Sequence, residues 1–132
     1  MTNFMAIYKP YPKYKNSNIP WLGEIPEHWE VMRAKVIGEF SGSTVDKKIN
    51  EGETLIRLVN FTDVFNNKSL EIHNKNFMKV SAKPSQIVSF NLKIGDVLFT
   101  PSSEDRFDIG RSNVVKYSDV SLLYSYHLIR LR

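Results

Sequence analysis

The chain has 132 residues, of which 42% are hydrophobic and 12% aromatic. A chain of this length forms one ordinary domain, and its apolar content is enough for a core, which excludes wholesale disorder. It has no cysteine, so disulfides, thiolate metal sites and a cysteine nucleophile are excluded. No apolar stretch approaches the length of a bilayer crossing, and the start lacks a secretory signal pattern. We therefore expect a soluble cytoplasmic protein.

The net charge of +4 is unevenly distributed along the chain. Residues 1–66 hold eight lysines and arginines against eight acidic residues, whereas residues 67–132 hold ten against six. A basic half permits a polyanionic partner, because phosphate contacts supply much of the affinity of proteins for nucleic acid. The charge by itself does not require such a partner.

The first half of the chain predicts few regular elements. The first twenty residues mix proline, polar and tyrosine residues without a period, so we expect residues 1–18 to be a flexible tail and 19–132 to be a single domain. Apolar residues spaced by three over 30–40 predict a short amphipathic helix. A polar loop follows over 41–52. Residues 54–59 are β-branched and apolar, which predicts a strand.

The second half predicts mostly strands. Ser81 is positioned to cap a short helix that runs through Phe90, with Pro84 in its first turn. Residues 96–100, 112–117 and 122–131 predict three further strands. We therefore expect an α+β fold with a mostly antiparallel β-sheet or partial barrel and a few short helices.

The sequence offers little for catalysis. The three histidines are far apart and lack the spacing of metal ligands: His28, His73 and His127. Glu104, Asp105 and Asp108 form an acidic group, but the adjacent Arg106 and Arg111 favour a solvated loop over a magnesium site. There is no glycine-rich phosphate loop and no nucleophile elbow. We expect this chain not to be an enzyme.

The most informative segment is Trp-Leu-Gly-Glu-Ile-Pro-Glu-His-Trp, from Trp21 to Trp29. Two tryptophans bracket a turn that contains Ile25 and Pro26, which is typical of a small aromatic cluster that docks the tail onto the following helix. The segment also closely resembles the start of the target-recognition domain in specificity subunits of type I restriction–modification enzymes from bacteria. In that family, Trp-Leu-Gly-x-Ile-Pro-x-His-Trp precedes the first helix.

Two later segments agree with this resemblance in order and spacing, and it covers residues 11–132. The segment over 93–100, with Gly95-Asp96, is similar to the family's Gly-Asp-(Ile/Val)-Leu strand, although Gly-Asp before apolar residues is by itself a common turn into a strand. Residues 101–110 resemble a variant of the loop that follows, in which many members carry a shorter, glycine-bearing sequence. Complete subunits have two recognition domains and long helices, so the resemblance implies the N-terminal part of one domain.

The resemblance implies a DNA-binding protein without its own chemistry. A recognition domain of this family reads one half of a bipartite site in double-stranded DNA and directs methylation and cleavage by partner subunits. The implied partners are DNA and the methyltransferase and restriction subunits, with no membrane. The implied cofactors (S-adenosylmethionine, ATP and magnesium) belong to those subunits, and none binds this chain. The alternative is a truncated remnant that does not bind DNA and acts as a protein-interaction module.

Direct readout of DNA needs donors and acceptors held at base edges, and cations at phosphates. The side chains expected to face bases lie in one loop: Ser102, Ser103, Glu104 and Arg106. The expected phosphate contacts are Lys47, Lys48, Lys68, Lys75, Lys79, Lys83 and Arg111. The residues expected to be structural are Trp21, Ile25, Pro26, Trp29, Gly95, Asp96 and Gly110. The alternative for each lysine is a solvated surface charge. The alternative for the loop is a flexible acidic tip without contacts, which the repulsion between Asp105, Asp108 and DNA phosphates would favour.

Overall fold

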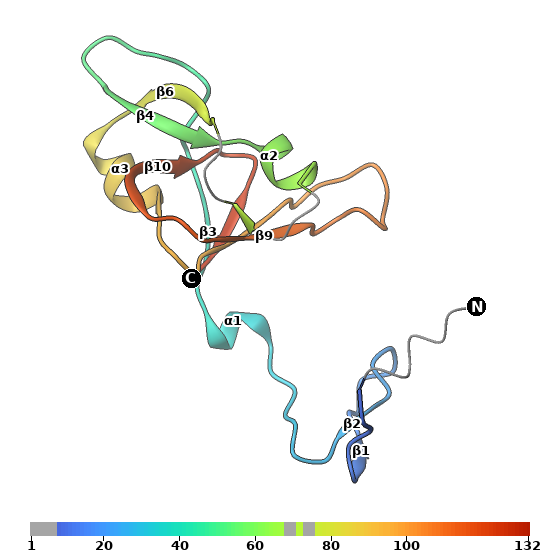
Figure 1. Cartoon of the computed structure of the whole chain (residues 1–132). Helices are drawn as coiled ribbons and strands as arrows, with labels where there is room; N and C mark the ends of the chain where they lie inside the picture. Colours follow the sequence, from blue (N-terminus) through green and yellow to red (C-terminus); the bar gives the residue numbers. More distant parts are fainter. Residues whose placement is uncertain (1–7, 68–70, 73–75) are drawn as a thin grey trace. The chain divides into compact units, whose positions relative to one another are not determined.

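The structure is a computed structural model, and it describes residues 8–67, 71–72 and 76–132. The chain divides into two compact units, Met1–Ile37 and Gly38–Arg132 (Figure 1). Lys68 and Lys75, which the sequence predicts as phosphate contacts, lie outside the described residues.

The first unit contains a small hairpin. Strands β1 (Tyr14–Asn16) and β2 (Glu24–Pro26) pair antiparallel, and Gly23 turns the chain back with a φ of +69°. The prediction of no regular element in the first twenty residues is therefore wrong at β1. The partner strand supplies the hydrogen bonds that the local sequence pattern does not reveal. Helix α1 (Ala34–Ile37) is shorter than the predicted 30–40.

The aromatic cluster of this unit differs from the predicted one. The ring of Tyr11 lies 5.8 Å from Trp29 and 5.2 Å from His28, whereas Trp21 is 83% exposed. Trp29 is itself 49% exposed, whereas Ile25 of β2 is 6% exposed. The prediction of a cluster between Trp21 and Trp29 is thus wrong, and the residue that joins Trp29 comes from the segment predicted as a tail.

The second unit contains two sheets and two short helices in its described part (Figure 1). Its strands are β3 (Phe40–Gly42), β4 (Thr54–Val59), β5 (Glu71–Ile72), β6 (Met78–Ala82), β7 (Asn91–Leu92), β8 (Val97–Phe99), β9 (Ser112–Val115), β10 (Asp119–Tyr124) and β11 (Ile129–Leu131). Its helices are α2 (Phe61–Phe65) and α3 (Pro84–Phe90). The strand orders are β6-β4-β10-β7 in one sheet and β3-β11-β8-β9-β5 in the other.

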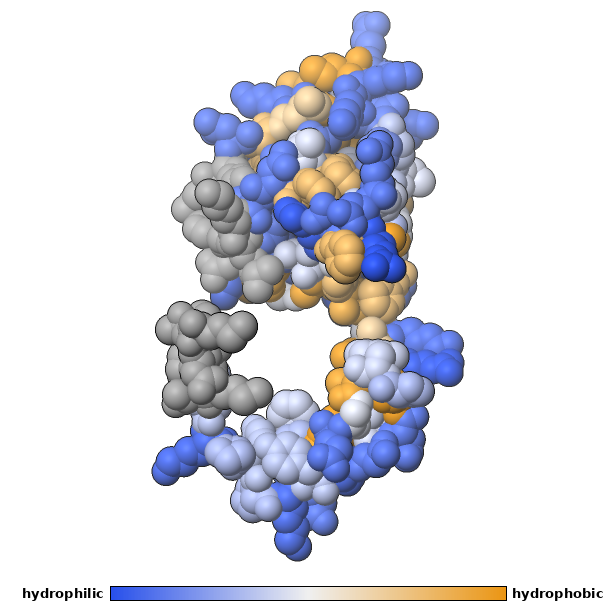
Figure 2. All heavy atoms as spheres, turned by 90° about the vertical axis from the view of Figure 1, so that its right-hand side faces the viewer, coloured by the Kyte–Doolittle hydropathy of each residue, from blue (hydrophilic) through white to orange (hydrophobic). Residues whose placement is uncertain are grey.

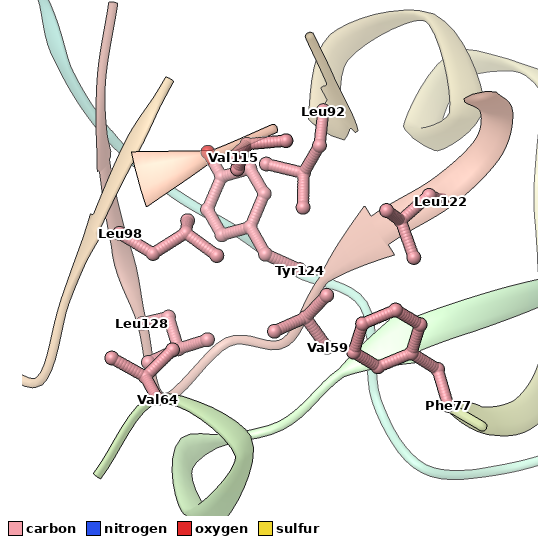
Figure 3. Packing of buried hydrophobic residues seen from close by; sticks show 9 residues of the cluster. All are labelled: Val59, Val64, Phe77, Leu92, Leu98, Val115, Leu122, Tyr124 and Leu128. Carbon is pink, nitrogen blue, oxygen red and sulfur yellow. The ribbon is translucent and has the colours of Figure 1, made fainter. Parts of the chain in front are cut away.

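The main hydrophobic core lies between the two sheets. Tyr124 is fully buried among aliphatic side chains from both of them, including Val59, Leu98 and Val115 (Figure 3). Its hydroxyl donates a hydrogen bond to the backbone oxygen of Ser41 at 3.0 Å, which satisfies the polar end of the buried ring. Burial of this side chain raises the pKa of Tyr124.

A second core covers the opposite face of the four-stranded sheet. Leu58 and Leu123, which are register partners on β4 and β10, pack with Val45 and with Ile87 of α3. Since Leu122 belongs to the main core and Leu123 to the second one, β10 is buried on both faces. A strand in this position reads as a continuous apolar run rather than as an alternation.

The predicted mixed fold with mostly antiparallel sheets and few short helices is confirmed. Two strand pairs, β4 with β10 and β5 with β9, are parallel. Pro84 begins α3 as predicted, but Lys83 is the N-cap, because Ser81 lies within β6 and its hydroxyl donates to Glu53. In the described ranges no helix has the length and hydrophobicity of a membrane span.

The single strand predicted over 122–131 is wrong. The chain leaves β10 at Tyr124, turns through Tyr126 and His127, and enters the other sheet as β11. The amide of Leu128 donates to Ser125 O at 3.1 Å, which closes this turn. One apolar run therefore supplies strands to both sheets.

Gly95 and Asp96 form the turn into β8. Gly95 has a φ of +92°, a conformation that glycine adopts without strain. Asp96 is 2% exposed, and its carboxylate accepts hydrogen bonds from Nε and Nη2 of Arg132 at 2.9 and 2.7 Å. These bonds raise the pKa of Arg132. The buried carboxylate is thus paired with an opposite charge, as burial of an ion requires.

Candidate nucleic-acid interface

The loop over 101–110 is closed at its base by backbone hydrogen bonds. Thr100 N donates to Arg111 O, and Gly110 N donates to Thr100 O, both at 2.9 Å. Gly110 has a φ of +77°, which lets the chain turn back into β9. Because both ends meet at the buried Thr100, the loop projects from a fixed base at the side of the unit where α2 lies (Figure 1).

Hydrogen bonds also organise the loop internally. Asp105 N donates to Ser103 Oγ at 3.2 Å, and Phe107 N donates to Asp105 Oδ1 at 2.9 Å. Asp108 N donates to Asp105 O at 3.1 Å. These local side-chain-to-backbone bonds are those of Asx and Ser turns, which give a loop a defined shape. They also occupy acceptors of Ser103 and Asp105 within the loop.

Helix α2 lies beside the loop. It begins after Asn60, whose backbone N–H donates to the carboxylate of Asp63 at 2.7 Å, as in a capping box. Val64 is buried in the main core, and this contact fixes the helix on the unit. Phe61 and Phe65 lie one helical turn apart, and their rings stack at 5.5 Å with an angle of 18° between the planes.

Arg111 joins the loop to α2. Its Nη1 donates to Phe65 O and its Nη2 to Asp108 Oδ1, both at 2.8 Å. Its guanidinium also lies 4.5 Å from the centre of the Phe65 ring. Asn113 Nδ2 donates to the neighbouring Val64 O at 2.9 Å. Two side chains from the start of β9 therefore bind the last carbonyls of α2, which a helix end leaves without internal partners.

The loop and α2 together line an open hollow of about 670 Å³. Its walls are formed by Phe61, Phe65, Ser102, Ser103, Glu104, Asp105 and Asp108. Figure 2 looks at this side of the molecule and shows hydrophobic surface interleaved with hydrophilic surface over the second unit. The hollow thus combines an aromatic wall with a wall of hydroxyls and carboxylates.

The structure brings the four predicted base-facing residues into one loop but gives them different surroundings. Ser102 and Glu104 line the hollow and, within the described part of the chain, have no hydrogen-bond or ion-pair partner. Ser103 is engaged within the loop. Arg106 does not line the hollow, and its guanidinium lies over the exposed ring of Phe107 at 4.8 Å. Judged by the described residues alone, these four side chains offer a ligand the hydroxyl of Ser102, the carboxylate of Glu104 and the guanidinium of Arg106.

Of the predicted phosphate contacts that the structure describes, Arg111 lies at the base of the loop, whereas the lysines lie elsewhere in the unit. Lys47 and Lys48 are exposed in the segment before β4, where Lys48 O accepts a bond from Ser81 N, and Lys83 follows the paired end of β6. These three lysines lie at the start of β4, whereas α2 follows its end (Figure 1). Lys79 lies opposite Arg57 in the middle of the β4–β6 pair.

Arg57 is part of a second charged group, which joins β4 and β10, the two central strands of the four-stranded sheet. It forms an ion pair with Asp119, and its guanidinium lies 5.6 Å from the Tyr117 ring. The amide and hydroxyl of Ser121 each donate to Asp119 Oδ1 at 2.8 Å. These hydrogen bonds, followed by the charge of Arg57, lower the pKa of Asp119.

Sequence reasoning missed Phe61, Phe65 and Asn113 at this site. The signal for α2 is weak but present, since an asparagine followed three residues later by an aspartate, Asn60 to Asp63, is a helix-start pattern. Nothing local connects Phe65 with Arg111, because 46 residues separate them. Among the residues that the structure describes, no group of three histidine, aspartate or glutamate side chains has the geometry to hold a metal.

No protein-family model matches the chain. The chain is 28% identical, over 131 residues and 97% of its length, to a protein assigned as the specificity subunit of the type I restriction enzyme MjaX from Methanocaldococcus jannaschii. The predicted resemblance to specificity subunits of type I restriction enzymes is thus confirmed by a curated relative, and that relative comes from an archaeon. The chain spans 29% of the length of this relative.

Proposed function

We propose that this chain is a DNA target-recognition module of a type I restriction–modification specificity subunit. It reads one half of a bipartite site, and partner methyltransferase and restriction subunits carry out methylation and cleavage. The observation that carries the proposal is the loop over 101–110, which is fixed at both ends and presents Ser102 and Glu104, without a partner among the described residues, beside an aromatic wall. The similarity to an assigned specificity subunit supports the same reading.

The chemistry of the loop fits base edges in the major groove. The carboxylate of Glu104 can accept from the exocyclic amine of cytosine, and the guanidinium of Arg106 can donate to O6 and N7 of guanine. The hydroxyl of Ser102 can donate or accept. Because the loop is held by its closed base and by Arg111, binding DNA costs less conformational entropy than ordering a free loop would.

In this proposal the chain supplies recognition and no chemistry. S-adenosylmethionine, ATP and magnesium bind the partner subunits, and DNA recognition is assigned to the second unit. Two of the three carboxylates of the loop, those of Asp105 and Asp108, support this division of labour, since Asp108 is held by Arg111 and Asp105 by the backbone of Phe107. They are thereby engaged in shaping the loop.

The proposal is tested by selecting DNA from a pool of random duplexes with the purified chain and sequencing what binds. We expect one short motif to be enriched, and binding to that motif to exceed binding to a scrambled duplex. Both affinities should fall with salt, because each phosphate contact releases about 0.9 counterions from B-form DNA. Absence of an enriched motif, together with equal binding of scrambled DNA, would contradict the proposal.

A further inference from the structure

The aromatic wall of the hollow has a chemistry that the polar loop does not explain. Phe61 and Phe65 present a stacked apolar surface to a space that is otherwise lined by hydroxyls and carboxylates. Phe61 packs partly against the main core, whereas Phe65 is not among the side chains packed there. The hollow therefore offers one apolar contact opposite several polar ones.

Arg111 keeps this wall at a fixed distance from the loop. It binds the backbone oxygen of Phe65 and the carboxylate of Asp108 with the same guanidinium, and it covers part of the Phe65 ring. Asn113 binds the preceding carbonyl of α2 and is 1% exposed. These contacts hold α2 in place beside the loop. A ligand that binds against the loop therefore also contacts Phe61 and Phe65.

The apolar group on the edge of a base pair in the major groove is the C5-methyl of thymine. The other groups there are hydrogen-bond donors and acceptors, which an aromatic side chain does not satisfy. We propose that the Phe61–Phe65 face of α2 contacts a thymine methyl in the half-site, with Phe65 as a specificity-determining residue. The inference rests on the proposed function and adds to it a base that the polar loop residues do not select.

The experiment replaces thymine by deoxyuridine, one position at a time, in the motif enriched by the chain. This change removes the methyl group alone and leaves the protein untouched. We expect one position at which wild-type binding weakens about fourfold, which corresponds to about 0.8 kcal/mol for one buried methyl group. In Phe65→Ala the same replacement should change binding less than about 1.5-fold, because the contact is already lost.

Phe107→Ala is the matched control, because Phe107 is a phenylalanine of the neighbouring loop over 101–110 that does not line the hollow. For this variant we compare only the ratio of its affinities for the thymine duplex and the deoxyuridine duplex. This ratio should stay near fourfold, as in wild type. If Phe65→Ala does not fold, 5-bromodeoxyuridine at the sensitive position and ultraviolet light should crosslink the wild-type chain within residues 61–65.

The outcomes separate this inference from the proposed function. An enriched motif in which no thymine responds to deoxyuridine overturns the thymine contact and leaves DNA recognition standing. An equal response in wild type and Phe65→Ala, or a crosslink elsewhere in the chain, overturns it in the same way. A chain that enriches no motif overturns the proposed function, and the thymine contact falls with it.

Discussion

At the scale of single residues, Arg111 shows what sequence chemistry can and cannot predict. An arginine beside a loop of hydroxyls is a reasonable phosphate contact, and the sequence predicts it as one. In the structure its guanidinium binds Phe65 O and Asp108, so much of its donor capacity is used inside the protein. The sequence predicts the composition of the loop over 101–110 because those residues are contiguous. It does not predict the partner helix, because that contact spans 46 residues.

Arg111→Lys separates the two roles of this residue. Lysine keeps the charge, so a simple phosphate contact would survive, but it cannot bind two acceptors in one plane and stack on Phe65. We expect affinity for the enriched motif to fall about tenfold, equivalent to about 1.4 kcal/mol, with binding to scrambled DNA unchanged. Fluorescence anisotropy titrations of both duplexes measure this. Undiminished affinity for the motif would show that Arg111 acts through its charge.

Asp119 gives the stability of the fold a dependence on acid. Its pKa is lowered in the folded chain, so its contribution to stability is fully present above the unfolded pKa, close to 4, and is lost as the pH falls through the folded pKa. Asp119→Asn lacks this contribution. Urea unfolding should therefore show a difference from wild type that is constant from pH 7 to 5 and shrinks below about pH 4. A difference that does not change with pH would contradict the assignment.

At the scale of elements, the pattern of apolar residues and the content of β-branched residues predict β4, β8 and β9 well, because these strands are short and bounded by turns. They fail at β10 and β11, where one apolar run crosses between two sheets at Tyr126 and His127. Alternation predicts which residues share a face, but it does not show that the chain changes sheets. The pairing in β1 is missed for a similar reason, because its partner β2 follows a seven-residue turn over 17–23 that the local pattern does not predict.

The burial of β10 on both faces makes its side chains sensitive to truncation. Leu123 is fully buried in the second core, together with Leu58 of β4 and beside Ile87 of α3. In contrast, Leu55 on β4 is 61% exposed. We expect Leu123→Ala to lower the free energy of unfolding by about 2–5 kcal/mol through lost contacts and a cavity. Leu55→Ala, the same change at an exposed position, should stay within about 0.5 kcal/mol. Equal effects in chemical denaturation would show that β10 is not central to the core.

At the scale of the whole molecule, the predicted phosphate-binding lysines and the candidate site lie at opposite ends of β4. The excess of lysine and arginine lies in residues 67–132, yet Lys47 and Lys48 lie at the start of β4 and the loop over 101–110 lies beyond its end. A strand of this length spans about 20 Å, more than the width of a major groove, which is about 12 Å. A duplex read by the loop reaches these lysines only if it follows the strand.

Substituting Lys47 and Lys48 together by alanine tests whether the DNA duplex follows β4 and reaches these lysines. If both side chains contact phosphate, the slope of log affinity against log salt should become shallower by about two, with the motif preference unchanged. Val88→Ala, an exposed change on α3, is the control for effects on folding. An unaltered slope in the double variant would remove the two lysines from the interface and confine DNA to the loop and α2.

The central claim is that the loop over 101–110 discriminates between base sequences, and Arg106→Ala tests it most directly. Arg106 is exposed, and its described contact is with the neighbouring Phe107 ring, so the substitution should leave the fold intact. The measurement is the ratio of affinities for the enriched motif and a scrambled duplex at one salt concentration. We predict a loss of about 1–3 kcal/mol on the motif with scrambled binding nearly unchanged. An equal loss on both duplexes would make Arg106 a phosphate contact, and no loss on either would contradict the claim that this loop reads DNA.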